Sequence, residues 1–280
     1  MAKKAKKPTV VVPAVVPNVI PAAEILKKLH ALGYFNDKTW AQVKKIRGTE
    51  LAEAVKAYQA FNGLQPTGTV GPNTANRIAR RRCGLPDFNI TAPGGDVCKW
   101  PMAKIMYYHD VKLPGLTADQ VTQAYDIAFS QWAEVCNIEP TRADSHKTAN
   151  IYAKSGMGAT NGLDNRGGTL AWSELPCGVA ENVQLDQMFD EAEAWSFNMA
   201  VAVICHELGH ALGLPHLNAG NLMAPYYDPN VTAPRKGDVE EIVKLYGKRS
   251  KKYPITKDAA PQIGGTIVIN GRPYVLIPKT

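Results

Sequence analysis

One run of eleven residues limits the possible folds of this chain more than any other: His206-Glu207-Leu208-Gly209-His210-Ala211-Leu212-Gly213-Leu214-Pro215-His216. Residues four apart lie on the same face of a helix, so His206 and His210 present two imidazoles to one point. Gly213 can adopt the left-handed conformation that ends a helix and turns the chain, which lets His216 supply a third nitrogen. We therefore expect a helix that ends beside a three-histidine metal site.

The ligand set indicates a catalytic zinc. Three protein ligands leave the fourth position of a tetrahedral zinc open to water, whereas structural sites are closed. Glu207 directly follows the first histidine, so its carboxylate lies beside the metal without binding it, where it can take up a proton from the attacking water. Since three of the six histidines fall in this one pattern, ordinary helix histidines are the weaker interpretation. Glu207 is the expected catalytic base.

The remaining patterns divide the chain into two folded parts. Apolar residues recur at helical spacing in three segments near the N-terminus, 22–32, 50–61 and 73–80. Residues 83–98 are rich in Gly and Pro and indicate a boundary. Beyond it we predict strands at 104–108 and 149–153, and helices at 117–132, 197–213 and 237–246. The runs 266–269 and 274–277 flank Asn270-Gly271, which is typical of a hairpin.

The zinc motif and the following Asn221-Leu222-Met223-Ala224-Pro225 together resemble those of a metzincin, and from about residue 22 to 247 the chain is similar to a matrixin. The resemblance implies that Met223 forms the methionine turn beneath the metal. It also implies that Pro225 and Tyr227 help wall the main specificity pocket. The implied fold is α+β: a metzincin catalytic domain, with a twisted mixed sheet plus three helices, preceded by a small all-α three-helix propeptide domain. That propeptide is itself similar to peptidoglycan-binding modules.

The resemblance and the patterns together give an expected order of domains. It consists of a Lys/Pro-rich tail at 1–21, the helical propeptide at 22–87, a linker at 88–99, the zinc metalloendopeptidase domain at 100–247, and a C-terminal tail with the hairpin at 248–280.

A cysteine precedes the linker in Arg82-Cys83-Gly84-Leu85-Pro86-Asp87, which resembles the cysteine-switch motif of matrixins. In that family the cysteine sulfur occupies the fourth zinc position and excludes water, and a thiolate is a good zinc ligand. The chain has five cysteines, so at least one is unpaired within it. We expect Cys83 to bind zinc in a latent form. Arg81 departs from the family's proline, and the pairing of Cys98, Cys136, Cys177 and Cys205 stays open.

The resemblance also implies further metal sites. A structural calcium would be held by carboxylates and backbone carbonyls, which suit a hard cation. The expected ligands are the carboxylates of Asp164, Asp190 and Glu193 and the carbonyls of Asn165, Gly167 and Thr169. Ordinary solvated loop acids are the alternative. At the family's structural-zinc histidine positions stand Trp172 and Met188, and because neither can replace an imidazole we expect no second zinc.

Charge and hydropathy restrict the partners. The net charge of +7 is concentrated in short runs, which are more typical of solvated tails or processing sites than of a nucleic-acid-binding face. No apolar stretch approaches the roughly 20 residues that span a bilayer. Residues 8–23 loosely resemble a signal peptide, but their four prolines favour an extended tail. An extracellular location is therefore expected from the resemblance alone.

The expected function is a zinc-dependent metalloendopeptidase, made as a latent zymogen and acting on protein or peptide substrates. Activation requires a cut between Asp87 and Lys99, or displacement of Cys83. The alternative is a peptidoglycan-binding protein whose N-terminal module contacts the cell wall and whose peptidase acts on wall-associated targets. A catalytically dead scaffold is disfavoured because Glu207 and all three histidines are present.

Overall fold

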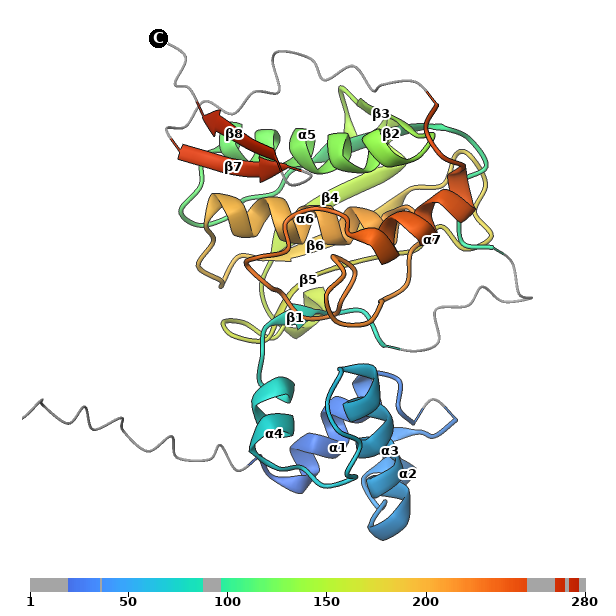
Figure 1. Cartoon of the computed structure of the whole chain (residues 1–280), viewed down its shortest axis with the longest axis vertical. Coiled ribbons are helices and arrows are strands. Elements are labelled where there is room, and N and C mark those ends of the chain that lie inside the picture. The colour runs from blue at the N-terminus through green and yellow to red at the C-terminus, as the bar shows by residue number, and fades with distance from the viewer. Residues whose placement is uncertain (1–19, 36, 88–96, 251–264, 270–271, 277–280) are drawn as a thin grey trace, which may run out of the picture.

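The computed structural model describes residues 20–35, 37–87, 97–250, 265–269 and 272–276, the last two as backbone. The predicted Lys/Pro-rich tail and linker therefore lie largely outside the described residues. Figure 1 shows a helical unit below a larger half that is built around a sheet.

The N-terminal unit contains four helices: α1 (Ala22–Ala31), α2 (Trp40–Val43), α3 (Gly48–Phe61) and α4 (Pro72–Ile78). Its core forms where the apolar face of α1, with Leu26 and Leu29, meets Val55 and Tyr58 of α3. The predicted count of three helices was wrong by one. Helix α2 is a single turn of four residues, too short to show a hydrophobic period, and Thr39 and Gln42 cap it reciprocally.

The larger half is built on a six-stranded sheet in the order β1-β5-β6-β4-β2-β3. Its strands are β1 (Arg82–Cys83), β2 (Lys104–His109), β3 (Glu139–Arg142), β4 (Ile151–Gly156), β5 (Thr169–Ser173) and β6 (Leu185–Asp190). Only the β5–β6 pair is antiparallel, so the sheet is mixed, as predicted. Strand β1 comes from the end of the N-terminal unit and extends the sheet at the β5 edge.

Three long helices complete this half: α5 (Ala118–Val135), α6 (Phe197–Ala211) and α7 (Lys236–Tyr246). Two short 3₁₀ turns, His146–Thr148 and Ala159–Asn161, lie in its loops. Helix α5 begins at Thr117, whose hydroxyl accepts from Gln120 N at 3.2 Å. Its buried Trp132 donates to the Cys205 carbonyl of α6 at 2.8 Å and so ties the two central helices together. The mixed sheet with three helices, preceded by a helical unit, confirms the predicted fold class.

Strands β1, β3, β5 and β6 were missed from the sequence. Strand β6 is buried at five of its six positions and therefore lacks the alternation that marks a half-buried strand. Strand β3 has only four residues, none of them buried. The predicted hairpin is confirmed as an antiparallel pair, β7 (Gly265–Ile269) with β8 (Arg272–Leu276), while Asn270-Gly271 lies outside the described residues.

The cysteines divide into one pair and three thiols. Cys98 and Cys177 form a disulfide that closes a separation of 79 residues. Cys83, Cys136 and Cys205 are free and buried. The Cys205 thiol donates to Gln131 Oε1 at 3.0 Å inside the core, which agrees with a packing role. No helix in the described part of the chain is long and apolar enough to cross a membrane.

Candidate metal centre

Helix α6 positions two of the three predicted histidine ligands. It begins at Ser196, whose hydroxyl accepts from Met199 N at 3.3 Å, and it ends just before Gly213. Gly213 has φ +105°, and a Cβ there would collide with the carbonyl oxygen of Cys98. Both the conformation and the close approach therefore require glycine at this turn. The turn brings His216 back to the helix, as predicted.

The three imidazoles converge. Ring centroids lie 4.7 Å apart for His206 and His210, 4.8 Å for His210 and His216, and 5.5 Å for His206 and His216. Each Nδ1 is within hydrogen-bonding distance of a backbone carbonyl. For His206 it is that of Leu222 at 2.8 Å, for His210 that of Leu214 at 2.7 Å, and for His216 that of Pro86 at 3.2 Å. Donation from Nδ1 leaves Nε2 as the ligand atom, an arrangement typical of metal-binding histidines.

The Cys83 thiol lies beside the three histidines as a fourth potential ligand. Its Sγ lies 3.5 Å from His210 Nε2 and 3.6 Å from Glu207 Oε2. One potential ligand atom from each of Cys83, His206, His210 and His216 lies within 4.8 Å of the others, and all four residues are buried. His216 Nε2 is buried with no hydrogen-bond partner among the described residues. A buried set of three imidazoles and one thiol, with a nitrogen left unpartnered, fits tetrahedral zinc.

Glu207 lies beside this cluster and is fully buried. Burial raises the pKa of its carboxyl group to about 8, against a lowering contribution from the Cys83 thiol. Its Oε1 has no hydrogen-bond partner among the described residues. The raised pKa makes the Glu207 carboxylate a stronger base beside the metal ligands, and Oε1 is the oxygen free to take up the proton.

Backbone hydrogen bonds hold Cys83 in place from both sides. On the β5 side, Arg82 N donates to Gly168 O at 3.0 Å and Gly84 N donates to Ala171 O at 2.7 Å. On the other side, Cys83 N donates to Pro225 O at 2.9 Å, and Tyr227 N donates to Arg81 O at 3.3 Å. Residues 81–84 thus lie as an extended peptide between a strand edge and a loop, which is the geometry of β-augmentation.

Comparisons with known proteins match both halves. The matrixin family model matches residues 99–247, and the model of a putative peptidoglycan binding domain matches residues 22–78. The chain belongs to the matrixin family. It is 32% identical to matrix metalloproteinase-20 of Homo sapiens over 77% of this chain and 47% of that protein. It is 31% identical to macrophage metalloelastase of Oryctolagus cuniculus over 76% of this chain and 47% of that protein. It is 29% identical to interstitial collagenase of Sus scrofa over 86% of this chain and 52% of that protein. The chain spans about half the length of these relatives.

The predicted methionine turn of this matrixin lies beneath α6. Met223 is buried, and a Cβ at Gly209 would collide with its sulfur, so helix and turn are in close contact. The buried carboxylate of Asp238 accepts from Leu222 N at 2.7 Å and from Met223 N at 3.0 Å. Because the Leu222 carbonyl in turn meets His206, Asp238 helps to orient a metal ligand. The sequence reasoning missed this role, although an acidic residue in the first turn of a predicted helix was a visible signal.

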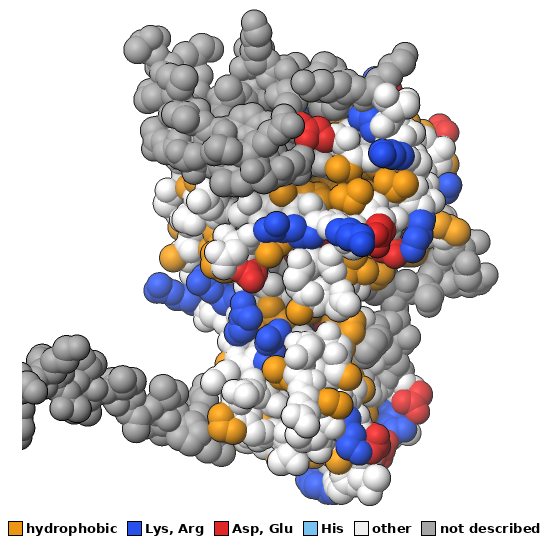
Figure 2. Space-filling view, viewed as in Figure 1, with side chains coloured by type: hydrophobic (Ala, Val, Ile, Leu, Met, Phe, Trp, Pro, Cys, Tyr) orange, Lys and Arg blue, Asp and Glu red, His pale blue; other side chains and the backbone are white. Residues whose placement is uncertain are grey.

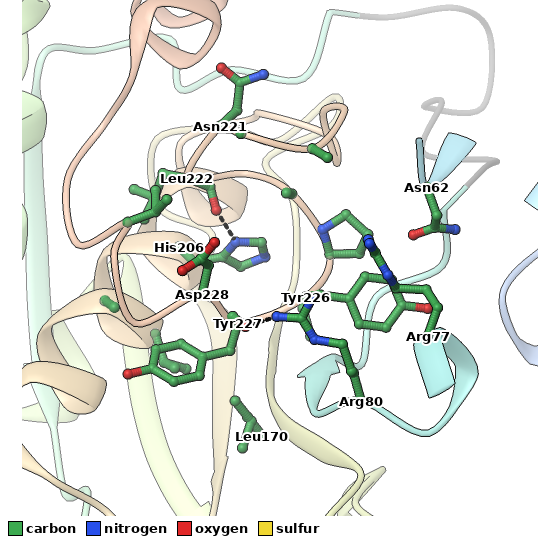
Figure 3. A pocket seen from close by; sticks show the side chains of 18 of the residues that line it. Asn62, Arg77, Arg80, Leu170, His206, Asn221, Leu222, Tyr226, Tyr227 and Asp228 are labelled. Carbon is green, nitrogen blue, oxygen red and sulfur yellow. Dashed lines mark hydrogen bonds between the residues drawn. The ribbon is translucent and has the colours of Figure 1, made fainter. Parts of the chain in front are cut away.

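The predicted specificity residues line a cavity beside the histidines. Its volume is about 150 Å³, and Pro225, Tyr227, His206 and Glu207 all contribute to its wall. Figure 3 shows His206 and Tyr227 at this cavity. Five residues of the N-terminal unit also line it: Phe61, Asn62, Arg77, Arg80 and Cys83. The helical unit therefore closes one side of this cavity.

Burial, together with the charges of Glu193 and Asp164, raises the pKa of Asp190, so the three predicted calcium carboxylates lie near one another. Among the side chains of the described residues, however, only the Cys83–histidine cluster brings three or more potential ligand atoms within 4.8 Å of one another. Glu193 instead accepts from Gly167 N and from Arg81 Nη1, and Asp164 accepts from Thr169 N at 2.5 Å. Asp190 Oδ2 is buried without a partner in this part of the chain. Calcium binding here, including through the Asn165 carbonyl, stays a prediction.

Trp172 and Met188 face each other across the β5–β6 pair. Trp172 Nε1 donates to the Asn161 carbonyl at 2.7 Å. The absence of a second zinc also stays a prediction, which metal analysis can test.

Proposed function

We propose that this matrixin is a zinc-dependent metalloendopeptidase that is latent while Cys83 occupies the metal site. The observation that carries the proposal is the convergence of one ring nitrogen from each of three histidines and one sulfur beside the buried carboxylate of Glu207. His206, His210 and His216 would hold the zinc. When bound, the metal would supply a Lewis acid that polarises the scissile carbonyl and acidifies a water.

The other roles fall to the chain itself. Glu207 accepts a proton from the attacking water and then passes it to the leaving amine. The β5 edge and the Pro225–Tyr227 loop offer the carbonyl and amide groups that now bind residues 81–84. A substrate would lie extended in the same place, because these groups pair with any peptide backbone.

The enzyme is latent because the Cys83 thiol excludes water from the metal site. With its sulfur 3.5 Å from His210 Nε2, Cys83 fills the position that water needs. A tethered thiol has an effective concentration on the order of millimolar, so modest intrinsic affinity suffices. Activation therefore requires cleavage between Asp87 and Lys99, or displacement of the thiol.

The disulfide supports an extracellular site of action. Structural disulfides persist in oxidising compartments and are rare in the cytosol. The Cys98–Cys177 bond joins the start of the matrixin region to the segment after β5. A matrixin that works outside the cell is consistent with this bond.

Wall binding by the N-terminal unit is the second candidate, since residues 22–78 match a putative peptidoglycan binding domain. An inhibitory role is better supported, because the hydrophobic cluster of this unit includes Tyr226 of the matrixin region. A pull-down of the full chain on purified cell-wall sacculi separates the two. Retention on the sacculi would favour the wall-binding role.

The test of the peptidase is cleavage of a quenched fluorescent peptide library by the full chain, before and after treatment with a thiol-reactive mercurial. Activity should appear only after treatment, should require zinc, and should fall roughly 10²–10⁴-fold in Glu207→Gln, which keeps the volume of the side chain. Metal analysis should give a single zinc per chain, lost in His210→Ala. A treated, zinc-loaded wild-type protein that cleaves nothing would refute the proposal.

A further inference from the structure

Tyr226 stands between the two predicted specificity residues, Pro225 and Tyr227, yet it packs into the other half of the molecule. It is 6% exposed and belongs to the hydrophobic cluster of the N-terminal unit. Its hydroxyl forms a hydrogen bond with that of Tyr58 on α3. When the helical unit leaves, this ring loses its cover.

Three guanidinium groups surround the Tyr226 ring. Their central carbons lie 5.4 Å (Arg77), 5.8 Å (Arg80) and 5.1 Å (Arg82) from the ring centroid. These distances are within the roughly 6 Å over which a cation is attracted to an aromatic face. Figure 2 shows Lys and Arg side chains gathered where the helical unit meets the sheet half.

The three arginines differ in their other partners. Arg82 forms an ion pair with Asp87 at 2.6 Å, so its charge is balanced within the N-terminal unit. Arg80 donates from Nη2 to the Tyr227 carbonyl at 2.8 Å, across the junction. Figure 3 shows Arg80 reaching Tyr227, with Arg77 close to Tyr226. Arg77 and Arg80 both line the cavity that also contains His206 and Glu207.

Removal of the helical unit would leave three groups with one chemical preference. They are the Tyr226 ring, the Tyr227 carbonyl and the carboxylate of Asp228, which lines the same cavity. The Asp228 carboxylate is already exposed, and its Oδ1 accepts from Asn230 N and Nδ2 at 2.9 and 3.0 Å, so it keeps its negative charge and a second oxygen for a cation. An aromatic face, a carbonyl acceptor and a negative charge together suit a guanidinium or ammonium group. In the latent chain Arg77 and Arg80 satisfy part of this set.

We infer that residues 226–228 form a subsite for a basic side chain of the substrate, which Arg77 and Arg80 occupy in the latent chain. The inference rests on the proposed peptidase function and adds a substrate class to it: peptides with Arg or Lys near the scissile bond. Tyr226 and Asp228 are its specificity-determining residues.

The test uses the full chain after mercurial treatment and three matched peptide sets. The three sets carry Arg, citrulline and Leu, respectively. Within a set, that residue is placed in turn at each position from three residues before to three residues after the scissile bond. Citrulline keeps the shape of arginine without its charge. At one position we expect kcat/KM to be about tenfold higher for Arg than for citrulline. Tyr226→Leu and Asp228→Asn should each bring this ratio close to one.

The matched control is Tyr152→Leu. It removes a different cation–aromatic contact, with Lys154 Nζ at 5.0 Å from the ring, on β4. This variant should keep the Arg/citrulline ratio. Equal kcat/KM for Arg and citrulline at every position, or a ratio that Tyr226→Leu and Asp228→Asn leave intact, would overturn the subsite.

Binding separates this inference from the peptidase proposal. Fluorescence anisotropy uses mercurial-treated Glu207→Gln that also carries Arg77→Gln and Arg80→Gln, so that the chain's own arginines do not occupy the subsite. It should show the same tenfold preference for the Arg peptide over the citrulline peptide. If the treated wild-type protein cleaves no peptide while this preference is measured, the peptidase proposal fails and the subsite stands. If peptides are cleaved but neither kcat/KM nor binding distinguishes Arg from citrulline, the subsite fails and the peptidase stands.

Discussion

The ion pair between Arg82 and Asp87 is the position at which the latent state is most open to a quantitative test. Both side chains are almost fully buried, with Arg82 Nη2 and Asp87 Oδ1 2.6 Å apart. Asp87 Oδ2 also accepts from the Tyr34 hydroxyl at 2.8 Å. The ion pair therefore closes the loop that carries Cys83, and the Tyr34 contact fastens this loop to the helical unit.

Asp87→Asn removes the charge with little change in shape. Removing one partner of a buried ion pair costs about 3–5 kcal/mol, because the other charge is left buried without compensation. Asparagine keeps a neutral acceptor, so the lower figure of about 3 kcal/mol applies. At 1.4 kcal/mol per tenfold, the population in which the Cys83 segment is released should rise about 100-fold.

The assay is the rate at which iodoacetamide alkylates Cys83 in the native, zinc-loaded chain, followed by mass spectrometry of the cysteine peptides. When opening and closing are fast, this rate follows the released population. Cys136 and Cys205 are buried in the sheet half and act as internal reporters, since they react only if that half opens. Asp37→Asn is the matched control, because Asp37 is exposed and its ion pair in the described part of the chain is with its neighbour Lys38.

A rise of less than about threefold in Asp87→Asn, with Cys136 and Cys205 still protected, would show that the buried pair does not hold the Cys83 segment. Equal acceleration at all three cysteines would point instead to general unfolding. The expected pattern is about 100-fold at Cys83 alone, with partial activity before any mercurial is added.

Three further outcomes follow from buried groups. Asp238→Ala leaves three backbone N–H groups without their acceptor, at about 1 kcal/mol or more each, so urea unfolding should show a loss of about 3 kcal/mol that exposed Glu240→Ala does not. Replacing both Cys98 and Cys177 by Ala should cost about 4 kcal/mol on the same measure, because the bond closes 79 residues. Burial lowers the pKa of His109 from 6.5 to about 4, so on acidification the unfolded chain takes up this proton before the folded chain does. The free energy of unfolding should therefore decrease as the pH is lowered from 6.5 to about 4. His109→Gln should flatten that part of the stability–pH curve.

The sequence predicted the metal site because its ligands are arranged by local geometry. The positions of two histidines one helical turn apart, and of a third after a glycine turn, can be predicted without knowledge of tertiary contacts. The same holds for Thr117, whose capping role is set by the residue three positions on. Fold class followed from the resemblance, and the structure confirms it.

Other features depend on contacts between segments far apart in the chain. The place of β1 in the sheet is set by pairing with β5, about ninety residues away. Sequence spacing likewise did not determine which of three candidates, Cys136, Cys177 or Cys205, pairs with Cys98. The role of Tyr226 could not be predicted from the sequence, because nothing in the neighbouring residues Pro225 and Tyr227 indicates that its ring enters the hydrophobic cluster of the helical unit.

Latency and substrate binding use overlapping groups, and this overlap limits which substitutions are informative. The carbonyls of Gly168 and Pro225 bind the Cys83 segment now, and a substrate would need them later. A change at the Tyr226 ring would therefore weaken both the latent state and the binding of basic peptides. The Arg82–Asp87 pair differs, since both partners leave with the helical unit. A substitution at Asp87 should thus release Cys83 without altering the cleavage preference of the activated enzyme, whereas one at Tyr226 should alter both.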